Sequence, residues 1–318
     1  MTTMPSTTRT RQTVEVPEND ETTSSRRRAT WIPAAAVVLW VAVAVVIGSG
    51  LDTLRTNDGL LAGTGPALEI VWVATALALV IPSAVSLTLA RTLVPLAPIV
   101  AVAIALERTD TSTVAGVALS LMVTLAVWSA PIGSHHLQAG AYGAERRFPL
   151  RPPTGYVVAS ALAWCLTIGL GLIAARSEGT ATTVVAGALA IALAAISAPR
   201  WHRLSRRWLV LVPTGLVVHD PLVLAETLML RRSEVAALTI ATDDSPADLT
   251  GGVGGPTLEL ATVESVTAVL ATGPRRPGGR AIHLSAARLA PTRPGAVLRA
   301  WTQRRATPPP STQRSSRS

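Results

Sequence analysis

The sequence predicts a membrane-spanning helical bundle followed by a small all-β domain that ends in a helix. Between residues 31 and 199 lie six apolar stretches, arginines crowd against alternate ends of them, and a basic, strand-rich segment follows the last one. The composition agrees with this class. Of the 318 residues 49% are hydrophobic and 15% charged, and the mean hydropathy is +0.41, which is unusual for a soluble protein of this length.

The charge pattern favours a lipid partner. The formal net charge is +9, and every positively charged side chain is an arginine. Because most of these arginines lie beside apolar stretches or in the terminal tails, we expect anionic phospholipid headgroups of the bilayer as the partner, and no nucleic acid.

Cys165, the single cysteine, lies inside an apolar stretch, which excludes an intrachain disulfide and a cysteine-based metal site.

Six stretches are candidates for membrane helices, which need about 20 apolar residues each. They are 31–50, 67–90, 93–106, 113–131, 156–175 and 181–199. The first resembles a signal peptide, but its length and the long preceding tail favour an uncleaved span. The third is short and contains Pro95 and Pro98, so it is either a short kinked span or a re-entrant segment.

The distribution of arginine decides between these readings and sets the orientation. Arginines at 26–28 place the N-terminus in the cytoplasm. With six spans, the clusters at 146–151 and 200–207 fall on that same side, whereas the opposite loops hold few arginines among carboxylates. If the third stretch did not cross, the cluster at 146–151 would face outward. The pattern therefore predicts a plasma-membrane protein with six spans, 31–199, and both termini in the cytoplasm.

Two further features concern the tails and the last two spans. Residues 1–30 and 306–318 are rich in Thr, Ser, Pro and Arg, and we expect both to be disordered. Small residues recur every four positions along the last two spans, which predicts a close helical hairpin. They are Ala159, Ala163, Thr167, Gly171 and Ala175 in one span and Thr182, Ala186, Ala190, Ala194 and Ala198 in the other.

Chemical motifs are sparse, so we expect no catalytic residue, no cofactor and no metal. The spans carry no ionisable group at mid-depth, whereas transporters usually do. A small-solute carrier would need a polar cavity lined by hydroxyls near the prolines of the second and third spans. An integral membrane enzyme would need His135, His136, Glu145 and His202 to converge. Adjacent histidines point different ways on a helix, so we interpret His135 and His136 as solvated or headgroup-facing.

The segment after the last span predicts a small β domain. Pro213-Thr214-Gly215 separates the apolar runs 209–212 and 216–219, which is typical of a hairpin. Further strands are predicted at 222–230, 237–241, 257–262, 266–271 and 281–289, and a closing helix at 296–304. About seven short strands followed by one helix describe a small barrel or sandwich. That order matches a pleckstrin-homology-like (PH-like) fold.

The run from Arg200 to Trp208, which continues into Leu-Val-Leu-Val-Pro-Thr-Gly, resembles the juxtamembrane start of bacterial membrane-anchored PH-like domains. The whole chain resembles actinobacterial multi-pass membrane proteins. The resemblance implies a cytoplasmic PH-like domain over residues 200–305 and supplies no catalytic residues. The Pro-Thr-Gly turn lacks the basic residues with which eukaryotic PH domains bind phosphoinositides, so the resemblance does not imply phosphoinositide binding.

These observations favour a non-enzymatic scaffold or regulator whose cytoplasmic domain docks to anionic lipid or to a protein partner. A small-solute transporter with a cytoplasmic regulatory domain is the alternative. Arginines and tryptophans beside the spans are typical of the headgroup layer. The residues expected at the lipid interface are Trp201, Arg203, Arg206, Arg207, Trp208, Arg146, Arg147 and Arg151.

Overall fold

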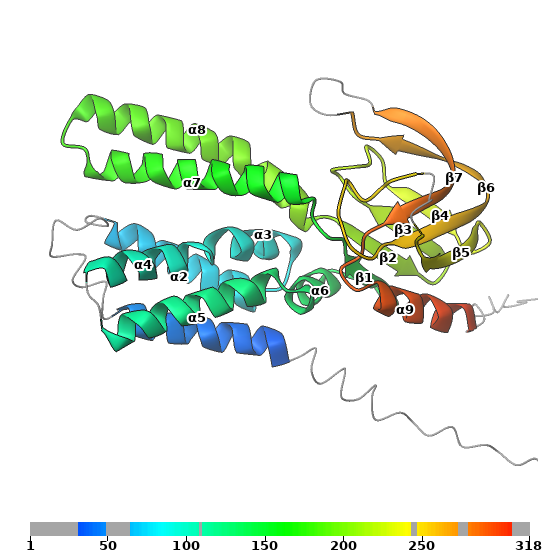
Figure 1. Cartoon of the computed structure of the whole chain (residues 1–318), viewed down its shortest axis with the longest axis horizontal. Helices are drawn as coiled ribbons and strands as arrows, with labels where there is room; N and C mark the ends of the chain where they lie inside the picture. The colour runs from blue at the N-terminus through cyan, green and yellow to red at the C-terminus, as the bar shows by residue number, and fades with distance from the viewer. Residues whose placement is uncertain (1–30, 49–63, 108–109, 243–246, 273–278, 307–318) are drawn as a thin grey trace, which may run out of the picture.

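The computed structural model describes residues 31–48, 64–107, 110–242, 247–272 and 279–306. The predicted tails 1–30 and 306–318 lie outside these ranges, except for Ala306. A helical bundle and a β domain lie end to end along the long axis of the molecule (Figure 1). The two ends of the bundle are called here the domain-facing end and the far end.

Five helical segments among the described residues are long and apolar enough to cross a membrane. They are Trp31–Gly48, Ala84–Leu106, Thr111–Trp128 (α5), Thr154–Arg176 (α7) and Thr180–Ser205 (α8). The second combines α3 (Ala84–Leu93) and α4 (Leu96–Glu107). Two shorter helices complete the bundle: α2 (Gly65–Val80), which is apolar, and α6 (Ala130–Ala139), which lies at the domain-facing end (Figure 1). The prediction of membrane-type helices is confirmed.

The boundary between the second and third predicted spans is wrong. The chain breaks at residues 81–83 rather than at Arg91. Pro82 cannot donate a backbone hydrogen bond, and Ser83 caps α3. Its Oγ accepts from the Ser86 amide (3.0 Å), and its own amide donates to Ser86 Oγ (2.8 Å), a reciprocal capping box. Residues 84–90 therefore join the third span, which reaches 23 residues.

The last two spans form the predicted hairpin, with α7 packed along α8 (Figure 1). The helix α8 has 26 residues in all and continues past Pro199, where the span was predicted to end, to Ser205. Contacts with neighbouring helices account for this continuation. The Trp201 ring lies edge-on to Trp128 at 5.7 Å, and His202 Nδ1 lies 3.0 Å from Thr88 Oγ1 in α3.

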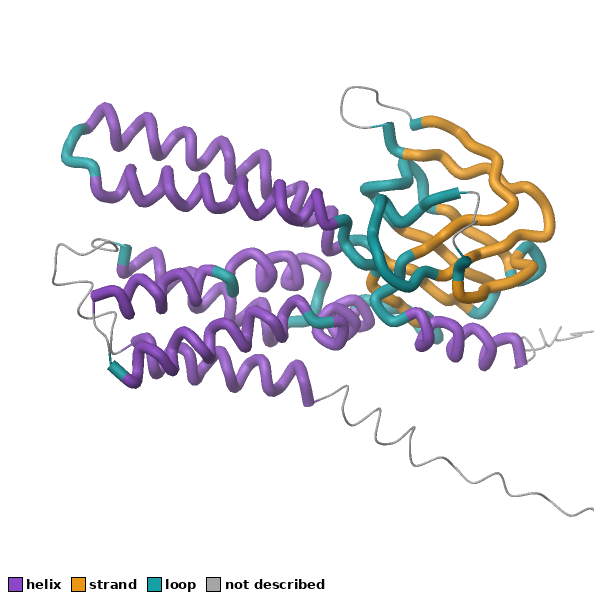
Figure 2. Tube along the Cα trace, in the orientation of Figure 1, coloured by secondary structure: helices purple, strands orange, loops and turns teal. Residues whose placement is uncertain are grey.

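The β domain consists of two antiparallel sheets and a closing helix (Figure 2). The first sheet has the order β1 (Arg146–Pro149), β2 (Trp208–Val212), β3 (Gly215–His219), β4 (Leu228–Arg231). The second has the order β5 (Val235–Ile240), β6 (Leu258–Leu270), β7 (Arg280–Leu289), and α9 spans Pro294–Ala306. Both sheets and α9 share one core, which includes Leu209, Leu211, Leu216, Leu258, Leu260, Leu289 and Trp301.

The predicted hairpin is confirmed as β2 and β3, and the predicted last helix as α9. Two other predictions need correction. The runs 257–262 and 266–271 form the single strand β6, whose pairing with β7 shifts between Ala261 and Val266, so a β-bulge lies where two separate strands were predicted. Of 222–230, only the end is strand.

The β domain also begins earlier in the chain than predicted. The strand β1 comes from the connection between α6 and α7 and pairs with β2, and α8 continues through residue 200 to Ser205. The boundary at residue 200 therefore does not separate the two parts. The strand β1 has four residues, which is too short for an alternation of apolar and polar residues to be recognised in the sequence. This strand was therefore not predicted.

Candidate functional site

The junction between the bundle and the β domain is the candidate site, because the predicted lipid-interface residues lie on the segments that cross it or close to them in the chain. Three such segments connect the two parts: 140–145 between α6 and β1, 150–153 between β1 and α7, and 206–207 between α8 and β2. The crossing segments are bonded to each other as well. The Leu150 amide donates to Arg207 O (3.0 Å). The β domain is therefore built into the end of the bundle rather than tethered by one linker.

Trp208 packs the β domain onto the bundle. It is half-buried and contacts an apolar cluster that includes Ile32, Leu87 and Ile132 at the domain-facing end. On the β domain, its ring stacks on His219 with centroids 4.8 Å apart, and the Arg147 guanidinium lies 5.7 Å from the ring centroid. Trp208 therefore joins elements from both parts.

Two of the predicted lipid-interface residues lie inside the protein, so that prediction is wrong for them. Arg207 is 1% exposed, donates through Nη1 to Arg151 O (2.6 Å) and through Nη2 to Thr250 O (3.0 Å), and pairs with Asp220. Trp201 is 5% exposed and packs against Trp128. A buried guanidinium needs protein partners, and Arg207 has them.

Two more predicted residues are partly exposed but occupied by other groups. Arg147 forms an ion pair with Glu145 at 3.1 Å. Arg151 donates to the backbone oxygens of Gly254 (2.8 Å) and Pro256, and burial lowers the pKa of its guanidinium. Both arginines therefore fasten loops of the β domain.

Three arginines remain exposed. The Arg146 guanidinium lies 5.7 Å from the centroid of the Phe148 ring. Because Pro149 pairs with Trp208, Arg146 lies at the opposite end of β1 from Trp208. Arg203 and Arg206 lie at the domain-facing end of α8. Their guanidinium groups make no hydrogen bond or ion pair with any residue in the described ranges. They remain available to an external anion.

The charges that act on His219 at the junction come from two arginines and one aspartate. Burial, followed by the charges of Arg206 and Arg147, lowers the pKa of His219, and Asp220 opposes the effect. His219 Nδ1 lies 3.0 Å from Thr227 Oγ1. The two arginines beside His219 fit a surface that attracts anions.

The four residues that a membrane enzyme would need do not converge. His136 is buried against Ile132 O and Ala78 O (3.1 Å each), whereas His135 is exposed. Glu145 pairs with Arg147, and His202 faces Thr88. In the described ranges, no group of three or more His, Cys, Asp or Glu side chains could hold a metal ion.

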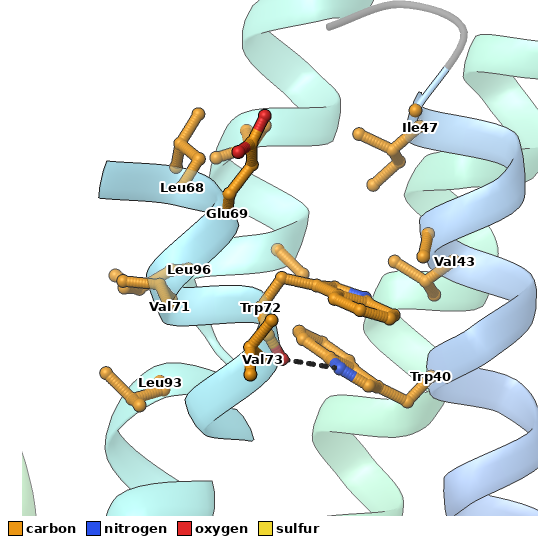
Figure 3. Close-up of a pocket in the computed structure, with 14 residues that line it drawn as sticks. Trp40, Val43, Ile47, Leu68, Glu69, Val71, Trp72, Val73, Leu93 and Leu96 are labelled. Carbon is orange, nitrogen blue, oxygen red and sulfur yellow. Dashed lines mark hydrogen bonds between the residues drawn. The ribbon is translucent and has the colours of Figure 1, made fainter. Parts of the chain in front are cut away.

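A cavity of about 400 Å³ lies between the first helix, α2 and the α3–α4 segment (Figure 3). Its walls are apolar, with Trp40, Trp72 and Leu96 among them, and Glu69 is the charged residue in the lining. Trp40 Nε1 donates to Trp72 O at 3.3 Å. This apolar cavity is therefore not the hydroxyl-lined cavity that the carrier hypothesis requires.

Three hydroxyls of the spans donate hydrogen bonds within their own helices. Thr75 Oγ1 donates to Val71 O (2.7 Å), Thr124 Oγ1 to Ser120 O (2.8 Å) and Thr167 Oγ1 to Ala163 O (2.8 Å). This bonding is the ordinary fate of hydroxyls in apolar helices, so it does not favour a solute site.

Sequence reasoning missed Asp220, although the hairpin itself points to it. The pairing of Trp208 with His219 places the preceding residue, Arg207, opposite the following one, Asp220. A single turn assignment therefore pairs the two charges.

Comparison of the chain with protein families, with curated proteins and with solved structures finds no match. The functional argument therefore rests on the geometry of the junction.

Proposed function

We propose that this protein is a non-enzymatic scaffold or regulator of the plasma membrane. It has six spans, both termini in the cytoplasm, and a cytoplasmic PH-like β domain docked on anionic headgroups. The observation that carries the proposal is the exposure of Arg203 and Arg206 at the end of α8. There the last apolar helix gives way to the β domain, and an anionic headgroup layer would meet both guanidinium groups.

The helices support six passes. The apolar helix α2 adds one to the five longer segments. The first helix begins and α8 ends at the domain-facing end of the bundle (Figure 1), as an even number of passes requires. The positive-inside rule assigns that end to the cytoplasm, because the arginine clusters at 146–151 and 200–207 lie there.

Lipid docking is tested with the full chain in nanodiscs of phosphatidylglycerol or of phosphatidylcholine. We expect the anionic lipid to raise the melting temperature of the wild type. The double variant R203Q/R206Q should lose most of that gain, since each arginine near an anionic surface is worth about 1 kcal/mol. The control R231Q changes an exposed arginine of β4 and should keep the gain. An undiminished gain in R203Q/R206Q would refute lipid docking.

Orientation needs a separate experiment. In a C165S background, Ser177→Cys reports on the loop between α7 and α8, and Ser233→Cys on the turn between β4 and β5. A membrane-impermeant maleimide should label position 177 on intact cells and position 233 only after permeabilisation. The reverse pattern would contradict the cytoplasmic assignment of the β domain.

A further inference from the structure

The C-terminal end of α2 leaves a backbone oxygen without a helical donor. The Ile81 amide donates to Leu77 O at 2.9 Å. The next donor along the helix would be residue 82, which would serve Ala78 O, but that residue is proline and has no N–H. A carbonyl left alone in an apolar bundle is costly. Ala78 is 3% exposed, so this oxygen needs a partner from within the protein.

His136 of α6 supplies that partner from 58 residues away in the chain. The side chain is 1% exposed, and its Nε2 lies 3.1 Å from Ala78 O. Its Nδ1 lies 3.1 Å from Ile132 O, one turn back in α6. Both ring nitrogens lie at hydrogen-bond distance from a carbonyl oxygen, and we assign the N–H to Nε2 because Ala78 O lacks a helical donor.

Gln138, two residues further along α6, makes the equivalent link to the β domain. Its Nε2 donates to Glu145 O (2.8 Å), and its Oε1 accepts from the Arg147 amide (3.0 Å). One side-chain amide thus bonds the backbone on both sides of Arg146 at the start of β1. The strand β1 in turn pairs with β2, the strand that follows α8.

We propose that α6 is a coupling helix, in which His136 and Gln138 are positioning residues. His136 fixes it to the break between α2 and α3, and Gln138 fixes it to β1. A displacement at the α2–α3 break is thereby transmitted to the first sheet of the β domain. This coupling uses hydrogen bonds within the chain, so it does not depend on lipid docking.

The test separates the two bonds of His136 by side-chain length. Gln at position 136 carries an amide nitrogen that reaches the position of Nε2, whereas Asn reaches only the position of Nδ1. The full chain is measured in phosphatidylcholine nanodiscs by hydrogen–deuterium exchange of residues 76–81 and 146–149. His135→Leu, at the exposed neighbouring position, is the control.

We expect H136N and H136L to exchange about tenfold faster than the wild type in both segments, as the loss of one bond to a buried carbonyl implies. H136Q and H135L should stay near the wild type. Q138A should accelerate residues 146–149 and leave 76–81 unchanged. If H136L does not fold, the comparison of H136Q with H136N still decides. Equal exchange in those two variants, or acceleration confined to 76–81, would overturn the coupling.

Discussion

Arg207 and Asp220 form a bidentate ion pair inside the β domain. Arg207 Nε donates to Asp220 Oδ1 at 2.8 Å and Nη2 donates to Asp220 Oδ2 at 2.6 Å, and each side chain is 1% exposed. Because Arg207 also bonds Arg151 O and Thr250 O, the pair fastens the segments that lead into α7 and out of α8. It is a structural fastening of the junction and not a lipid ligand.

Removal of one partner of this pair should lower the free energy of unfolding far more than removal of both. Asp220→Ala leaves a buried guanidinium without its counter-charge, which typically destabilises by about 3–5 kcal/mol. The double variant R207L/D220L removes both charges and should be less destabilised than D220A. The measurement is the free energy of unfolding of the full chain in detergent. Glu226→Ala, at an exposed position near by in sequence, is the control.

A double variant that is destabilised by the sum of R207L and D220L would contradict this account. Additive losses would mean that the two side chains act independently, although the distances place them in direct contact.

Gly215→Ala should loosen the first sheet. A Cβ at position 215 would lie 1.9 Å from Leu230 O, so β3 and β4 approach too closely for any side chain there. Forcing an extra methyl group into a packed site costs about 1–3 kcal/mol. Limited proteolysis of the full chain should cut the β domain faster in G215A, whereas Thr214→Ala, exposed in the same turn, should behave like the wild type. Equal cutting rates in the two variants would refute the argument.

Apolar periodicity predicted the helices and most strands, but it was less reliable where a helix face had to be chosen. In the stripe along α8, Ala186 is buried and Ala194 is half-buried, whereas Thr182 and Ala198 are exposed. An α-helix has about 3.6 residues per turn, so residues four apart drift around its surface. Only the middle of such a stripe can face a neighbour.

The arginines near the junction share one local pattern and have three different fates. Arg203 is exposed, Arg147 is paired with Glu145, and Arg207 is buried with Asp220. Composition identifies all of them as interfacial. Which arginine is buried, paired or exposed depends on the strand register and on β1, which pairs with the distant strand β2. The membrane class was therefore predictable from the sequence, and so was the Arg207–Asp220 pair from the hairpin register, whereas the role of Arg147 in β1 was not.

Trp208→Ala should loosen the packing of the β domain on the bundle without unfolding either part. The ring is half-buried between Leu87, Ile132 and His219, so its loss should cost about 2 kcal/mol, less than for a fully buried tryptophan. Faster hydrogen exchange is expected in β2 and in α6. Trp31→Ala, which removes a tryptophan that is 71% exposed, is the matched control. A loss of stability in W31A as large as in W208A would contradict the assignment.

The stability of the β domain should fall as the pH drops through the range in which free imidazole binds a proton. The pKa of His219 is lowered by burial and by Arg206 and Arg147. Below the ordinary histidine value of about 6.5, the unfolded chain therefore binds a proton that the folded chain resists. Under this linkage, stability is retained above that value and is lost progressively towards the lowered pKa of the folded state.

His219→Asn should flatten this dependence, because it removes the titrating ring and keeps an amide near Thr227. The melting temperatures of H219N and of the wild type are measured between pH 8 and pH 5, at about 0.15 M salt, where screening within about 8 Å is weak. Their difference should stay constant above pH 7. Below pH 6.5 the wild type should lose more stability than H219N. Parallel curves across the whole range would show that His219 does not carry the effect.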